Sequence, residues 1–119
     1  SVADKKGNYI GGVILPGLRV SLNSLSGKTA QLPYISLEVP NKVIGKNTID
    51  CMRAGIVFSN VDMIDGILDR MEKELGETPT VIATGGLARF ITPLCRHEII
   101  FDDALLLKGL LILYRKNTQ

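Results

Sequence analysis

The longest run of apolar residues at helical spacing lies between Thr48 and Leu75. Asn47 or Thr48 can cap the start of this helix, and Asp50 is favourable in its first turn because the helix dipole is positive there. Gly76 provides a natural stop. The pattern therefore predicts one long amphipathic segment in the middle of the chain.

Two features bear on how this helix is built and used. Gly55 and the Ser59–Asn60 pair are positions where it could kink or divide. Even so, the segment far exceeds the average helix of about 11–12 residues. An amphipathic helix of this length often carries a subunit interface, so we expect one here.

Strand and helix patterns alternate in the second half of the chain. Thr80–Ala83 and Glu98–Phe101 have strand character. Leu87–Cys95 is predicted to be helical, with Pro93 bending or ending it, and Ala104–Tyr114 is predicted to be a heavily buried leucine-rich helix. This alternation predicts an α/β fold with a parallel or mixed sheet covered by helices.

The first half begins with a predicted hairpin, from Ser1–Asp4 to Tyr9–Ile14. A strand that is under way at residue 1 suggests that further sequence precedes it. Gly11–Gly12 indicates a bulge or the close approach of another group, or else a simple defect in the strand. A short helix from Pro16 to about Gly27 follows. Lys28–Val43 is then predicted to be an ordered loop, with an extended piece near Tyr34–Leu37.

The turn Thr84-Gly85-Gly86 follows a β-branched run and precedes a predicted helix. Adjacent glycines let a backbone or a flat ligand approach the main chain, and in an open α/β sheet such a turn lies at the edge where ligands bind. A plain strand-to-helix turn is the alternative. The spacing does not match the common glycine-rich phosphate loops.

Composition limits the class of protein. The 119 residues correspond to one domain, 45% hydrophobic and without tryptophan, which suits an α/β interior. The net charge is +2, and acidic and basic residues are interspersed, so the sequence does not predict a basic surface that would bind nucleic acid or an anionic membrane. No apolar run approaches the roughly 20 residues of a spanning helix, and no secretory leader is evident. We therefore expect a cytoplasmic protein.

The candidate reactive residues are few. Cys51, Cys95 and the single histidine, His97, are too few for a zinc site of four protein ligands, so both cysteines are interpreted as reduced core thiols, with a disulfide as the alternative. His97 is interpreted as a surface residue rather than a catalytic one. Asp102 and Asp103 are interpreted as helix caps rather than as a base or metal ligand. Lys46 could meet a phosphate at the following helix start, although an exposed lysine is the commoner case.

Five short blocks follow one another along the chain: Gly11-Gly12-Val13-Ile14-Leu15-Pro16-Gly17, Thr29-Ala30-x-Leu32-Pro33, Ile44-Gly45-Lys46-Asn47-Thr48, Met63-Ile64-Asp65-Gly66 and Ala83-Thr84-Gly85-Gly86. The end of the chain carries Lys108-Gly109-Leu110 and Tyr114-x-x-Asn117. In sequence, order and spacing these segments resemble the C-terminal half of the type III pantothenate kinase family, and the resemblance covers essentially the whole chain.

The resemblance implies a kinase that transfers the ATP γ-phosphate to pantothenate in the first step of coenzyme A biosynthesis. It implies the actin-like/sugar-kinase fold, with residues 1–119 as the C-terminal ribonuclease H-like domain of a homodimer that uses Mg²⁺-ATP and a monovalent cation (K⁺ or NH4⁺). Thr48 matches the family's pantothenate-binding threonine. Thr84, Gly85 and Gly86 fall in its ATP-binding adenosine motif, and the long helix would help build the dimer interface.

The family's catalytic aspartate, its Gly-Ala-Asp-Arg motif and both of its phosphate motifs, one of which carries the potassium-binding aspartate, are expected upstream of Ser1 and do not occur in this chain. Because phosphoryl transfer depends on positioning and charge stabilisation around the phosphates, residues 1–119 alone are expected to be inactive, with no catalytic residue and no metal ligand of their own. Two alternatives are a non-catalytic accessory or regulatory domain and a structural dimerisation module.

Overall fold

A computed structural model describes residues 1–26 and 38–118 of the chain. The predicted extended piece at Tyr34–Leu37 lies outside these residues. Within them, no helix combines the length and the apolar character needed to cross a membrane. The elements, in chain order, are β1 (Val2–Ala3), β2 (Tyr9–Gly11), α1 (Leu18–Ser26), α2 (Thr48–Leu75), β3 (Val81–Ala83), α3 (Ala88–Ile91), the 3₁₀ turn η1 (Thr92–Leu94), β4 (Ile99–Phe101) and α4 (Leu105–Thr118).

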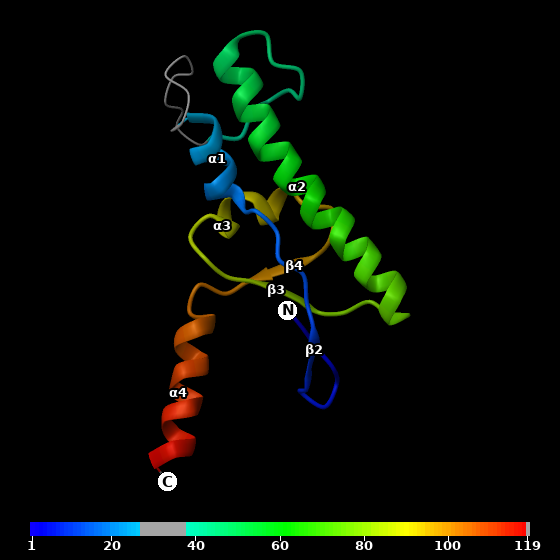
Figure 1. Cartoon of the computed structure of the whole chain (residues 1–119), viewed down its shortest axis with the longest axis vertical. Coiled ribbons are helices and arrows are strands. Elements are labelled where there is room, and N and C mark those ends of the chain that lie inside the picture. Colours follow the sequence, from blue (N-terminus) through cyan, green and yellow to red (C-terminus); the bar gives the residue numbers. More distant parts are fainter. Residues whose placement is uncertain (27–37, 119) are drawn as a thin grey trace.

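Helix α2 is the principal element of the fold, and it is continuous over 28 residues (Figure 1). Asn47 caps its start, since the side-chain oxygen accepts a hydrogen bond from the Asp50 N–H at 2.9 Å. Gly76 ends it in the left-handed conformation, with φ of 72°, and its N–H donates to the carbonyl of Glu72. The predicted long helix is therefore confirmed with both of its caps, and Gly55 does not divide it.

The hydrophobic core lies where α2 meets α1 and the α3–η1 segment. Ile56 and Val57 of α2 are almost completely buried, at 1% and 0% exposed. Half-buried apolar side chains from α1, α2 and α3 surround this core. The buried cluster consists of Leu18, Met52, Ile56, Val61 and Ile91.

The strands form two separate pairs rather than one sheet. β1 and β2 are antiparallel, with a register irregularity between Val2 and Ala3 and with Gly11 at φ of 140°. β3 and β4 are parallel, with Val81 opposite Ile99 and Ala83 opposite Phe101. The α/β class, the hairpin and a parallel pair of strands are confirmed, but the described residues do not form a single parallel or mixed sheet.

Proline divides the segment after β3. The prediction of one helix over Leu87–Cys95 is only partly right, because α3 stops at Ile91 and η1 begins with Thr92. Pro93 occupies the first turn of η1, where its missing N–H costs nothing. Residues 95–98 then connect η1 to β4.

Helix α4 corrects the sequence interpretation. It was expected to be heavily buried, yet none of its fourteen residues is buried. In Figure 1 it extends away from α2 and the core, as an arm at one end of the molecule. The radius of gyration of 17.4 Å exceeds the roughly 13.5 Å of a compact domain of this length. Its leucines are apolar enough for a core, but among the described residues no other element covers them.

Candidate functional site

Thr48 is the first residue of α2 and is exposed to solvent. A surface hollow of about 580 Å³ lies beside it, lined by the turn 45–48, the first turns of α2 and Leu25. Gly45 fits this turn because a Cβ there would collide with the backbone of Cys51. The arrangement places a hydroxyl and the positive end of a helix dipole at one opening, which favours a polar or anionic ligand.

The turn Thr84-Gly85-Gly86 lies directly after β3 and is exposed. Gly85 has φ of 104°, a conformation that favours glycine. Apart from the adjoining residues of the turn, no atom of the described residues lies within 4 Å of where a Cβ of Gly85 or Gly86 would be, so packing among these residues does not require either glycine. Open space beside the main chain leaves room for a ligand.

These two predicted sites are not brought together in the described residues. The hollow beside Thr48 contains none of Thr84, Gly85 and Gly86. Figure 1 shows the start of α2 at one end of the molecule and β3 near its middle. Within the part of the chain that the structure describes, the two positions therefore do not share a pocket.

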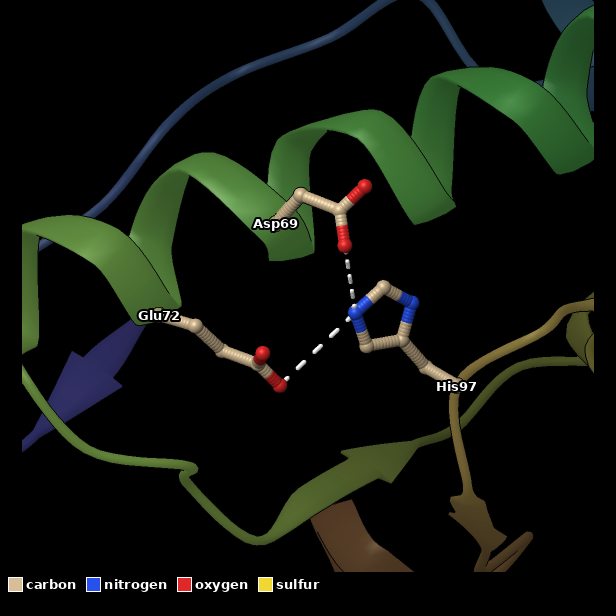
Figure 2. A group of neighbouring side chains, drawn as sticks. All are labelled: Asp69, Glu72 and His97. Carbon is tan, nitrogen blue, oxygen red and sulfur yellow. Dashed lines mark ion pairs between the residues drawn. The ribbon is translucent and has the colours of Figure 1, made fainter.

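A third cluster, around His97, escaped the sequence analysis. The His97 side chain is only 9% exposed, so its interpretation as a surface residue is wrong. Its Nδ1 lies 2.8 Å from Asp65 Oδ1, and its Nε2 lies 3.0 Å from Asp69 Oδ1 and 3.7 Å from Glu72 Oε1. Figure 2 shows the Asp69 and Glu72 side chains reaching from α2 towards the imidazole.

Asp65 is the most constrained acid of this cluster. Its carboxylate accepts hydrogen bonds from the backbone N–H groups of Arg96 and His97, at 2.8 and 3.2 Å, and from the His97 ring. Burial alone would raise the pKa of Asp65, but these hydrogen bonds outweigh it and hold the pKa below its ordinary value. Asp65 thus fixes both the segment before β4 and the orientation of the imidazole.

Asp69 contacts both Arg96 and the His97 ring. Arg96 donates to both of its oxygens, at 2.8 and 3.3 Å, and this pair lowers the pKa of Asp69. The sequence did contain a signal for this cluster: Asp65, Asp69 and Glu72 are spaced i, i+4, i+7 on one face of α2. The helical spacing of the apolar residues predicted α2, but the same spacing of its acidic residues was not used to predict an acidic face.

The remaining candidates have structural roles. Asp102 accepts a hydrogen bond from the Ala104 N–H at 3.0 Å, just before α4 begins, and Lys108 at 2.7 Å lowers the pKa of Asp102. Asp103 pairs with Arg89. Both cysteines are free thiols, as expected, but Cys51 is exposed rather than in the core. Cys95 is half-buried, and burial raises the pKa of its thiol.

The amino-acid sequence was compared with protein-family models and with curated proteins, and both comparisons point to the same family. A family model described as type III pantothenate kinase matches residues 1–70. The chain is 46% identical over 114 residues to the type III pantothenate kinase of Citrifermentans bemidjiense, covering 96% of this chain and 45% of that relative. It is 44% identical over 110 residues to that of Bacillus cytotoxicus, covering 92% and 42%, respectively.

A third relative gives the same result. The type III pantothenate kinase of Syntrophus aciditrophicus is 40% identical over 113 residues, which cover 95% of this chain and 44% of that relative. The chain thus spans less than half the length of the curated relatives it matches. With more than half of it matched by the family model and nearly all of it aligned with these relatives, the chain belongs to the type III pantothenate kinase family.

Proposed function

We propose that residues 1–119 are the C-terminal part of a kinase that transfers the γ-phosphate of ATP to pantothenate in the first step of coenzyme A biosynthesis. Family membership carries the proposal, since relatives described as type III pantothenate kinases align with 92–96% of this chain. The remainder of the enzyme would then supply the phosphate-binding and catalytic residues.

Thr48 is proposed to hydrogen-bond pantothenate. Its exposure on the first turn of α2, beside an open hollow, supports this role. A hydroxyl both donates and accepts hydrogen bonds, and the helix N-terminus adds a field that favours the carboxylate of pantothenate. The rigid cap at Asn47 would keep this hydroxyl in place before substrate binds.

Thr84, Gly85 and Gly86 are proposed to contact the adenosine of ATP. The open space beside both glycines and the position of the turn after a parallel strand support this assignment. The same reasoning supports the finer proposal of a ribonuclease H-like domain, of which β3 and β4 would be two of the strands. Homodimer formation and a cytoplasmic location complete the proposal.

The described residues near Thr48 do not fit a Mg²⁺ ion or a monovalent cation. The carboxylate in that turn, Asp50, accepts a hydrogen bond from the Asn47 amide at 2.8 Å, so it is committed to the helix cap. Binding of Mg²⁺ and of K⁺ or NH4⁺ is therefore assigned to the rest of the enzyme. The chain alone is expected to have no activity, and ATP- and pantothenate-dependent turnover above that of Thr48→Ala would contradict this.

The decisive test of Thr48 uses the full-length enzyme and two variants. Thr48→Val keeps the shape and removes the hydroxyl, and loss of one hydrogen bond should raise the KM for pantothenate roughly five- to tenfold. Thr48→Ser keeps the hydroxyl and should stay close to the parent. The KM for ATP serves as the internal control. An unchanged pantothenate KM in Thr48→Val would remove Thr48 from the substrate site.

A further inference from the structure

The cluster near the C-terminal end of α2 contains three side chains that can bind a metal ion. Asp69 and Glu72 lie one turn apart on α2, and His97 approaches them from the segment before β4 (Figure 2). Their potential ligand atoms lie within 4.8 Å of one another. We propose that Asp69, Glu72 and His97 bind a Zn²⁺ ion.

The two distances from the histidine nitrogen to the carboxylate oxygens suit a tetrahedral ion. His97 Nε2 lies 3.0 Å from Asp69 Oδ1 and 3.7 Å from Glu72 Oε1. Zinc lies about 2.0–2.2 Å from nitrogen and oxygen ligands, so two ligands of one tetrahedral ion are about 3.4 Å apart. The two observed separations bracket this value, and small side-chain rotations would equalise them.

The histidine is already oriented for a metal. Asp65 can only accept a hydrogen bond, so His97 Nδ1, 2.8 Å away, must carry a proton. In the neutral ring this leaves the lone pair of Nε2 directed at two carboxylates, a repulsive arrangement that a cation relieves. A buried carboxylate that fixes the second nitrogen is the usual support of a zinc-bound histidine.

The fourth coordination position has room for a solvent molecule. A hollow of about 320 Å³ adjoins the cluster, lined in part by Glu72, Thr80, His97 and Glu98. Three protein ligands with one open position are a common zinc arrangement, and imidazole with carboxylates favours zinc over magnesium or calcium. Arg96 competes for Asp69 but has an exposed side chain that can move away.

The site is separate from the proposed substrate site. Asp69 is 21 residues beyond Thr48 on α2, which corresponds to about 31 Å along the helix axis. An ion bound there would cross-link α2 to the chain entering β4. The inference therefore does not depend on the role proposed for Thr48.

The test is titration of the full-length protein with Zn²⁺, monitored by calorimetry and by NMR of the histidine ring. Cys51 is exposed and could bind zinc itself, so every variant carries Cys51→Ala. His97 is the only histidine in residues 1–119, and its ring signals, identified by their loss in His97→Gln, should shift until one equivalent of Zn²⁺ is bound. His97→Gln and Asp69→Asn should each weaken binding at least tenfold.

Three further variants separate zinc binding from a simple ion-pair cluster. Asp65→Asn should weaken binding about 10–100-fold through the histidine orientation. Arg96→Gln should strengthen it severalfold by freeing Asp69, and Glu74→Gln, an exposed acid on the same helix, should have no effect. Unshifted ring signals, or binding that survives His97→Gln, would overturn the proposal and leave the cluster as side-chain contacts without a metal.

Discussion

Helices α2 and α4 both have strongly apolar sequences, but they end in opposite environments. Seven residues of α2 are buried, including two polar ones, Asn60 and Asp65. In α4 none is buried, and Leu106 and Leu107 are 72% and 68% exposed. The comparison shows that the burial of a helix depends on which other elements pack against it. The apolar content of a helix alone does not predict this burial.

Polar contacts distinguish the two helices as much as packing does. The buried Asn60 of α2 donates to the Ile56 carbonyl at 2.7 Å, and Asp65 joins α2 to the chain before β4. The polar contacts of α4 are near its ends, with Asp102 and Lys108 at the start and Asn117 and Thr118 near the finish. Helix α2 is thus attached along its length, whereas α4 is attached near its beginning.

The largest expected effect comes from shortening a core side chain of α2. Ile56→Ala should lower the free energy of unfolding by about 2–5 kcal/mol, because the transfer free energy is lost and a cavity remains. Urea unfolding followed by circular dichroism measures this. A change below about 1 kcal/mol would mean that the contact of α2 with α1 and α3 does not hold in solution.

A smaller effect, dependent on pH, is expected at Asp65. Its lowered pKa means that the ionised carboxylate stabilises the fold at pH values above the ordinary 3.8, and this contribution is lost as the pH falls through the folded value. Asp65→Asn should cost about 1–3 kcal/mol near neutral pH.

The pH profile distinguishes this effect from general damage. The Asp65→Asn variant should lose less stability on acidification than the parent, because the removed carboxylate no longer takes up a proton on unfolding. Asp62→Asn, an exposed change on the same helix, is the control. Parallel acid profiles for Asp65→Asn and the parent would show that Asp65 is not the group responsible.

Local signals in the sequence were enough for much of the fold. Gly76 and the apolar period before it predicted where α2 ends, and Asn47 was one of two candidate caps for its start, since caps and amphipathicity act within a few turns. The alternation of strands and helices predicted a parallel or mixed sheet, and the parallel pairing of β3 and β4 agrees with it. The exposure of α4 did not, because it depends on surfaces that no local pattern encodes.

In the candidate site, too, the residues with local sequence signals were predicted, whereas a cluster formed by long-range contacts was not. Thr48 and the turn 84–86 were placed correctly on a helix start and a strand end, since both are local features. The cluster around His97 joins residues 31 and 32 positions apart, through Asp65 to Arg96 and His97. A lone histidine between two charged residues resembles a surface residue until the acids of α2 are placed opposite it.

The smallest expected effect is the counterpart of Ile56→Ala on the exposed helix. Ile112 of α4 is 55% exposed, so Ile112→Ala in residues 1–119 should change the free energy of unfolding by no more than about 0.5 kcal/mol. Urea unfolding followed by circular dichroism measures this as well. Because both substitutions replace isoleucine by alanine, the comparison of Ile112→Ala with Ile56→Ala does not depend on side-chain chemistry. Repeating it in the full-length protein sharpens the comparison, because a larger cost there would measure how much cover α4 gains from the rest of the enzyme. A cost equal to that of Ile56→Ala in residues 1–119 alone would instead mean that α4 packs against another surface in solution, and the contrast between the two helices would fail.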